Sequence, residues 1–228
     1  MNQSVVIPLR NGGPFIEETL DSIAGAPFVH EIVIVDDGSL DDGPTIAARW
    51  AERRGQRVVF TNVTSPDGPA GPSAARNRGA QVASGERLWF VDGDDLTTIA
   101  ELDPRRDPPA DTDVVYSRLQ RFALWPDGER RAEPERFPHV STLLVRREYF
   151  LAMGGFNEQL RYGEDLDFYQ RLLEQRAVIH EIDDITMLFR QHAGSYTGQR
   201  PEALRSGLFA ALRAAALRVR TESTAEES

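Results

Sequence analysis

Cysteine is absent from the 228 residues, which excludes disulfides, thiolate metal sites and cysteine nucleophiles. Long hydrophobic runs are absent too. The longest uncharged stretches, such as residues 22–30, are far shorter than the ~18 residues that span a bilayer. Basic residues are outnumbered, with 26 Lys and Arg against 36 Asp and Glu and a net charge of −10. Nucleic-acid binders normally carry a basic surface, so nucleic acid is not an expected partner.

The first four residues show neither the basic segment nor the cleavage pattern of a signal peptide. We therefore expect a soluble cytoplasmic protein without membrane association. Apolar residues make up 40% of the chain, enough to bury a sizeable core. The excess of acidic residues then raises a question: either it is a solvated surface, or some carboxylates are gathered for chemistry.

Strand-like and helix-like segments alternate in the first half of the chain. Gly55 is expected to end the second helix, and Ser73 to cap the third at its N-terminus. Alternation of this kind is typical of βαβ units and predicts an α/β fold with a mostly parallel central sheet flanked by helices. Strands are predicted at 5–7, 31–35, 57–61 and 87–91, and helices at 15–23, 41–54 and from 73 onward.

The second half is less regular. One domain is expected over 1–200, divided at about residue 96, followed by a helix at 201–220 and a disordered tail at 221–228. The apolar stripe of the helix at 201–220 predicts packing on the domain or on a second copy of the chain in a homodimer. Further strands are predicted at 114–122, 140–145 and 177–182, a loop at 102–113 and a helix at 164–175.

Two acidic groups follow predicted strands directly. Asp36 and Asp37 come after the second strand, and ligands of an open parallel sheet bind beyond the carboxyl ends of its strands. A carboxylate there can accept hydrogen bonds from a base or from ribose hydroxyls. The alternative is a simple turn in which an Asp caps the next helix.

The second acidic group, residues 92–95, follows the fourth strand. In an extended chain Asp92 and Asp94 project to the same side and could hold one divalent cation, while Gly93 allows a ligand to approach the backbone. Three gathered negative charges, counting Asp95, are costly without a cation. A polar loop is the alternative, although an acidic triplet after a bulky apolar strand gains nothing for packing.

Glu164 and Asp165 open a predicted helix. The helix dipole alone explains Glu164. Asp165 shares the inward helix face with Phe168 and Leu172, so it could act as a general base over a cleft.

Basic side chains provide two further candidates. Arg76, early in the third helix, could meet an anionic ligand. His192 follows Arg190 by two residues and is the most suggestive of the four histidines, although its meaning depends on the acidic groups.

Seven short motifs, in order and spanning about residues 4–195, resemble the family 2 glycosyltransferases, which have the GT-A fold. Each motif is weak alone, and their order carries the resemblance. They are Val6-Ile7-Pro8, Asp36-Asp37-Gly38-Ser39, Ala75-Arg76-Asn77, Phe90-Val91-Asp92-Gly93-Asp94-Asp95, Gly154-Gly155-Phe156-Asn157-Glu158, Gly163-Glu164-Asp165-Leu166-Asp167 and Arg190-Gln191-His192.

The resemblance implies a metal-dependent, inverting enzyme that moves one sugar from a nucleoside-diphosphate sugar, usually a UDP-sugar, to an acceptor nucleophile. The acceptor could be a small molecule, a glycan, a lipid-linked compound or a peptide. Residues 1–96 would form the nucleotide-sugar half and 97–200 the acceptor half.

The resemblance also assigns roles on the donor side. Asp37 would read the base, Asp36 would shape the turn, and Pro8 would bring backbone groups to the nucleoside. Arg10 stands where the family commonly has an aromatic residue, and could stack through its guanidinium plane. Asp92 would face the ribose or the donor sugar, with Gly93 and Arg76 beside it.

On the metal and acceptor side, Asp94 would bind Mg²⁺ or Mn²⁺, with His192 as a further ligand. Asp165 would deprotonate the acceptor. Asp95, Glu164 and Arg190 complete the residues that the resemblance assigns to the site.

Two alternatives remain open at this point. A phosphatase of the haloacid dehalogenase type also uses Asp-x-Asp after an apolar strand, but expects Thr or Val where Leu96 stands and a motif near the N-terminus. A non-catalytic sugar-nucleotide binder could keep the fold, although the presence of Asp92, Asp94 and Asp165 argues against it.

Overall fold

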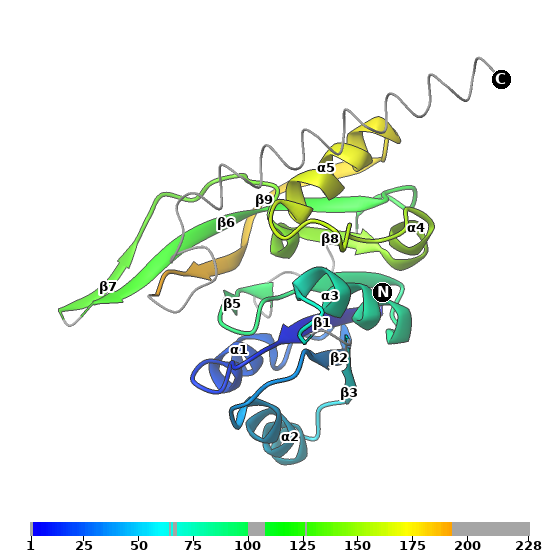
Figure 1. The fold of residues 1–228 in the computed structure, drawn as a ribbon. Coiled ribbons are helices and arrows are strands. Elements are labelled where there is room, and N and C mark those ends of the chain that lie inside the picture. Colours follow the sequence, from blue (N-terminus) through cyan, green and yellow to red (C-terminus); the bar gives the residue numbers. More distant parts are fainter. Residues whose placement is uncertain (1, 64, 66–67, 100–107, 126, 193–228) are drawn as a thin grey trace.

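The computed structural model describes residues 2–63, 65, 68–99, 108–125 and 127–192 (Figure 1). Within these ranges one nine-stranded sheet runs through the protein, in the order β3-β2-β1-β4-β8-β6-β9-β5, with β7 paired to β6. Its strands are β1 (Gln3–Leu9), β2 (Val29–Asp36), β3 (Val58–Asn62), β4 (Arg87–Phe90), β5 (Leu96–Thr97), β6 (Val114–Trp125), β7 (Gly128–Arg131), β8 (Leu143–Arg146) and β9 (Ile179–Arg190). The helices are α1 (Ile16–Ile23), α2 (Gly43–Arg54), α3 (Pro72–Val82), α4 (Arg147–Ala152) and α5 (Glu164–Glu174).

The first four strands form a parallel unit. β1 lies between β2 and β4, and β3 borders β2, all in parallel pairs. The carboxyl ends of β1, β2 and β4 therefore lie next to one another at one edge of the sheet. This arrangement confirms the βαβ prediction and brings the segments that follow these strands together.

The second half adds mixed pairing. β8 pairs antiparallel with both β4 and β6, whereas β6 pairs parallel with β9. β6 and β7 form an antiparallel hairpin that extends away from the rest of the protein (Figure 1). The last residues of β9 thus reach the same region as the segment after β4.

Strand alternation divides the core into two apolar clusters, one on each face of the sheet. Val5 and Ile7 of β1 face α1 and α2, whereas Val6 faces α3 and α5. Successive residues of a strand point to opposite faces, so one buried strand serves both clusters. Helices on both faces complete the three-layer α/β arrangement that the sequence predicts.

Several local predictions are confirmed. α2 ends at Gly55, which has a left-handed backbone with φ of 61°. The loop predicted at 102–113 has no helix or strand over its described part, 108–113. The predicted helix at 201–220 and tail at 221–228, and any dimer contact through them, lie outside the described residues.

Two local predictions are wrong. Ser73 lies inside α3, whose N-cap residue is Gly71, because Pro72 already occupies the first helical position. The strand predicted at 140–145 begins as a short 3₁₀ helix over Val140–Thr142 and becomes extended only in β8. Its β-branched residues favour a strand by composition, but the Oγ1 of Thr142 donates hydrogen bonds back to Phe137 and His139 and closes a turn there.

No sequence pattern predicted β5, β7 and α4, which are two to six residues long. Across the described ranges, no helix has the length and apolarity that crossing a bilayer requires.

Candidate active site

The site residues after β1 and β2 contact one another directly. Asp36 accepts a hydrogen bond from the Ser39 N–H at 3.0 Å, so it shapes its own turn as expected. Arg10 donates from Nη1 to the carbonyl oxygen of Asp37 at 2.8 Å. The Arg10 side chain is therefore held over the turn that follows β2. Pro8 lies in β1 opposite Val35 of β2.

Asp37 has main-chain partners. Its side chain is buried, and its two carboxylate oxygens accept hydrogen bonds from the N–H groups of Ala70 and Gly71, at 2.7 and 2.9 Å. The contacts fix the loop before α3 against the end of β2. In this arrangement Asp37 anchors that loop, and reading of a base by Asp37 stays a prediction.

A buried guanidinium joins two of the predicted acidic groups. Arg76, on α3, donates to Asp92 Oδ1 at 2.6 Å and to Glu164 Oε1 at 3.0 Å. Its side chain is 5% exposed, and its pKa is raised because the two carboxylates outweigh the cost of burial. Burial alone would raise the pKa of Asp92, but Arg76 holds it below its ordinary value. Arg76 thus connects the end of β4 to the start of α5.

Asp165 follows Glu164 in the first turn of α5. Burial first, and then the negative charge of Glu164, raise the pKa of Asp165 to about 7. One of its carboxylate oxygens accepts a hydrogen bond from the Leu166 N–H at 2.8 Å. A carboxylate with a pKa near neutrality can accept a proton at working pH and release it afterwards, which suits a general base.

Asp94 and His192 form the second part of the site. Their side chains meet with Oδ2 and Nε2 3.0 Å apart, although they are 98 positions apart in sequence. Burial and the nearby charge of Asp92 raise the pKa of Asp94. Among the described residues there is no group of three or more Asp, Glu, His or Cys side chains arranged to hold a metal ion. The part of Asp94 and His192 as metal ligands therefore stays a prediction.

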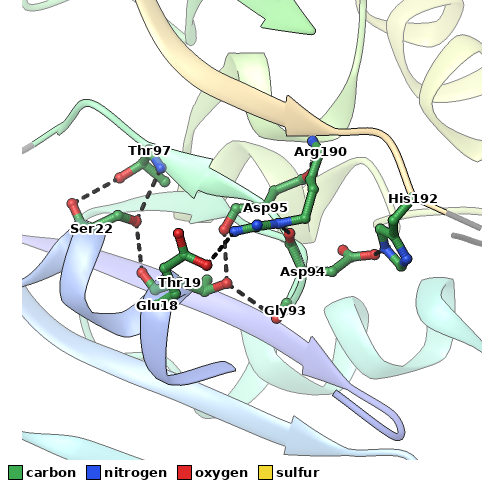
Figure 2. A network of polar contacts seen from close by, with 9 residues as sticks. All are labelled: Glu18, Thr19, Ser22, Gly93, Asp94, Asp95, Thr97, Arg190 and His192. Carbon is green, nitrogen blue, oxygen red and sulfur yellow. Dashed lines mark hydrogen bonds and ion pairs between the residues drawn. The ribbon is translucent and has the colours of Figure 1, made fainter. Parts of the chain in front are cut away.

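Arg190 fastens the acidic loop to its surroundings (Figure 2). Its Nε–H donates to the carbonyl oxygen of Asp94 and its Nη2 to Glu18 of α1, at 2.8 and 2.7 Å. Its main-chain N–H donates to Asp95, whose carboxyl is buried beside Asp94 and has a strongly raised pKa for that reason. Arg190 and Asp95 therefore hold the loop in place, and a direct part for either in the site stays a prediction.

Gly93 packs closely but without strain. A Cβ there would stand 3.4 Å from a methyl carbon of Leu9 and 3.5 Å from the carbonyl oxygen of Pro8, which are ordinary contact distances. Its carbonyl oxygen accepts a hydrogen bond from the hydroxyl of Thr19 in α1. Gly93 thus contacts β1 and α1, and close approach of a ligand to it stays a prediction.

Asn77, the neighbour of Arg76 on α3, makes a contact that no sequence pattern predicted. Its amide donates to the carbonyl oxygen of Phe156 and accepts from the N–H of the same residue, at 2.9 and 2.8 Å. Arg171 of α5 holds the other side of this turn by donating to the carbonyl oxygen of Gly155. The motifs at 75–77 and 154–158 are therefore in direct contact, which spacing alone could not reveal.

His139 is the second residue that sequence reasoning missed. Burial lowers its pKa to about 4, while the charges of Asp92 and Arg76 act on it in opposite directions. Its Nδ1 accepts a hydrogen bond from the Ser141 N–H at 3.3 Å, so the proton of the neutral ring is on Nε2. His139 lies outside every motif, and no sequence signal marked it.

Known proteins resemble this chain over most of its length. EpsJ of Bacillus subtilis (strain 168), an uncharacterized glycosyltransferase, is 28% identical over 219 residues, covering 85% of this chain and 62% of EpsJ. The crystal structure of residues 1–349 of S. aureus TarS superposes with a TM-score of 0.66 at 24% identity, covering 83% of this chain and 60% of that one. The mannosyltransferase PcManGT of Pyrobaculum calidifontis gives 0.68 at 21% identity, covering 93% and 64%.

The solved structures and the family model support different conclusions. At such identities the two solved structures show the fold alone, and they confirm the predicted α/β class of the GT-A type. The chain spans about three fifths of the length of these relatives. The model of glycosyl transferase family 2 matches residues 4–190, most of the chain. This match favours the transferase family over the phosphatase alternative. The protein is therefore a member of glycosyl transferase family 2.

Proposed function

We propose that the chain transfers one sugar from a nucleoside-diphosphate sugar to an acceptor hydroxyl or similar nucleophile, with inversion at the anomeric carbon. The observation that carries the proposal is the arrangement around Arg76, which joins a carboxylate at the end of β4 to the helix turn that holds Asp165. A donor-side group and a candidate base are thereby fixed relative to each other.

The positions of the strand ends support a nucleotide-sugar donor. In an open parallel sheet, nucleotides bind beyond the carboxyl ends of the strands, where Arg10, Asp37 and Asp92 gather. TarS has been crystallised with UDP and with UDP-GlcNAc, and PcManGT with GDP-Man. We infer a nucleoside-diphosphate sugar as the donor class, with a UDP-sugar as the first candidate.

A divalent cation fits the chemistry of the acidic loop. Asp94 and His192 present one carboxylate and one imidazole toward each other, and such ligands suit Mn²⁺, while Mg²⁺ prefers oxygen. Burial first, and then repulsion from Asp92, raise the pKa of Asp94, and a cation would relieve the repulsion. PcManGT was solved with Mn²⁺. Asp94 and His192 would hold the ion, which would supply charge stabilisation for the leaving diphosphate.

Asp165 is the proposed base. The acceptor oxygen gives its proton to the carboxylate of Asp165 and bonds to the anomeric carbon. The bond from that carbon to the diphosphate oxygen breaks, and the nucleoside diphosphate leaves with the electron pair. A single displacement from the opposite side inverts the anomeric centre. The pKa of about 7 allows Asp165 to take the proton near neutral pH.

A donor screen tests this function. The protein is incubated with UDP- and GDP-sugars, with Mn²⁺ or Mg²⁺, and with a panel of small-molecule, glycan, lipid-linked and peptide acceptors, while release of nucleoside diphosphate is followed. We expect release that requires the cation and is lost in Asp94→Asn. If calorimetry shows that the donor binds but no acceptor in the panel leads to release of nucleoside diphosphate, the protein is a non-catalytic binder and the proposal is contradicted.

A further inference from the structure

The guanidinium of Arg76 is shared between two carboxylates that belong to different parts of the fold. Its Nη2 donates to Asp92 after β4, and its Nη1 donates to Glu164 in α5. All three side chains are largely buried, with exposed fractions of 5%, 23% and 15%. Its Nε is buried with no hydrogen-bond partner in the described part of the chain. Among the described residues, the hydrogen bonds of the Arg76 side chain therefore go to these two acidic groups.

The guanidinium of Arg76 also lies against an aromatic ring. The planar guanidinium presents its N–H groups in a fixed fork, and its central carbon lies 5.9 Å from the centroid of the Phe156 ring. The next residue on α3, Asn77, binds the main chain of Phe156. One turn of α3 thus fixes both the start of α5 and the turn at 154–158.

Asp165 experiences this arrangement through its neighbour. The charged side chains that act on it are Glu164, which raises its pKa, and Arg76, which lowers it. Arg76 acts by its own charge and also by pairing with Glu164, whose negative charge is partly neutralised in the pair. The burial of Asp165 makes these neighbouring charges effective, because water screens them poorly there.

We propose that Arg76 is a positioning residue, which holds Glu164 against Asp92 and thereby determines how readily the neighbouring Asp165 gives up and takes back a proton. The inference rests on the proposed function only where Asp165 is regarded as the base. It assigns Glu164 a definite part as well, since Glu164 is the group through which Arg76 reaches the first turn of α5. Substitutions of Glu164 and of Arg76 should then shift the pH at which Asp165 ionises in opposite directions.

The direction of each change follows from charge. Glu164→Gln removes a negative charge beside Asp165 and leaves the Arg76–Asp92 pair in place, so Asp165 should ionise at lower pH, by roughly one unit. Arg76→Lys keeps a positive charge but loses the fork that reaches both carboxylates. Glu164 is then less neutralised, and Asp165 should ionise at higher pH, by roughly half a unit.

The test is a direct titration of Asp165. The whole protein is labelled with ¹³C at the aspartate carboxyl carbon, and the Asp165 signal is assigned as the one missing from Asp165→Asn. Its midpoint is measured between pH 4 and 9 in the wild type, Glu164→Gln and Arg76→Lys. Glu158→Gln is the matched control, because Glu158 accepts a hydrogen bond from Asn77 but does not act on Asp165.

We expect a lower midpoint in Glu164→Gln, a higher one in Arg76→Lys and an unchanged one in Glu158→Gln. A midpoint in Glu164→Gln within about 0.2 units of the wild type overturns the inference, as does an equal shift in the control. If Arg76→Lys fails to fold, Glu164→Gln still decides. The titration needs neither donor nor acceptor, so it is independent of transfer activity. Opposite shifts in a protein that transfers no sugar would support this inference and contradict the proposed function. Absent shifts in an active transferase would contradict this inference and support the proposed function.

Discussion

Gly155 lies so close to Asn77 that no side chain fits between them. A Cβ on residue 155 would stand 3.0 Å from Asn77 Cγ and closer still to its Oδ1. The φ of Gly155 is +71°, a left-handed backbone that side chains disfavour. The turn at 154–158 is held by Asn77 on one side and by Arg171 on the other. A glycine at 155 is therefore a condition for the contact between α3 and the turn at 154–158.

Gly155→Ala should destabilise the protein by about 2–4 kcal/mol, because it adds a clash with Asn77 to the strain of a positive φ. Gly154→Ala is the matched control. Its φ is +79°, but no described atom beyond its two chain neighbours lies within 4 Å of its Cβ position, so strain alone should cost about 1–2 kcal/mol. Urea unfolding of both variants checks this. Equal losses would show that the contact with Asn77 carries no energy.

Asp165→Asn should stabilise the protein at high pH. The folded pKa of about 7 lies above the ordinary aspartate value of 3.8, so the folded state binds more protons between these values. The free energy of unfolding consequently falls as pH rises from about 4 to 7, and a neutral amide removes this loss. We expect a gain of about 1–2 kcal/mol at pH 8 and little change at pH 4, by urea unfolding at both. A variant that is less stable than the wild type at pH 8 would contradict the raised pKa.

Glu31 should give the opposite pH dependence. It is buried in β2, which alone would raise its pKa, but hydrogen bonds from Ser84, Ser4 and Arg57 lower it to about 2. The stabilisation from its charge is present above about pH 4.5 and is lost as pH falls toward 2. Glu31→Gln should cost about 1–3 kcal/mol at pH 7 and less at pH 3, whereas Glu52→Gln, on the surface of α2, should change little. A constant loss at both pH values would count against this account.

Metal binding should depend on Asp94 and His192 together. Each variant, Asp94→Asn and His192→Gln, should weaken Mn²⁺ affinity by about 10- to 100-fold, measured by paramagnetic relaxation or calorimetry with a UDP-sugar present. Asp127→Asn, in the exposed β6–β7 hairpin, is the control and should bind Mn²⁺ like the wild type. Unchanged affinity in both site variants would remove them as ligands.

Strand patterns and acidic motifs were sufficient to predict much of this molecule. The buried apolar runs located β1 to β4, and parallel pairing then brought their carboxyl ends together without further information. The proximity of Asp94 and His192 came from the family resemblance, since nothing in a span of 98 residues indicates a contact. The raised pKa of Asp165 depends mainly on the desolvation of its carboxyl in the first turn of α5, although its residue is half-buried and the fully buried acidic residue of this helix is Asp167.

What the sequence could not supply were contacts made by polar side chains across the fold. Arg76 was expected to meet an anionic ligand, and its two partners are carboxylates of the protein itself. Asp37 was expected to face a base, and its oxygens accept main-chain N–H groups. A motif gives a residue type and an approximate place, whereas its partners depend on loops that converge only after folding.

The comparison of wild type and Asp165→Asn in sugar transfer is the most direct test of the account. Donor binding is measured by calorimetry and transfer by release of nucleoside diphosphate, on the same preparations with Mn²⁺ and an acceptor that the wild type uses. The account predicts unchanged donor affinity, a loss of transfer of roughly 100-fold or more, and a wild-type rate that falls as pH drops below about 7. Transfer by Asp165→Asn at the wild-type rate would contradict it.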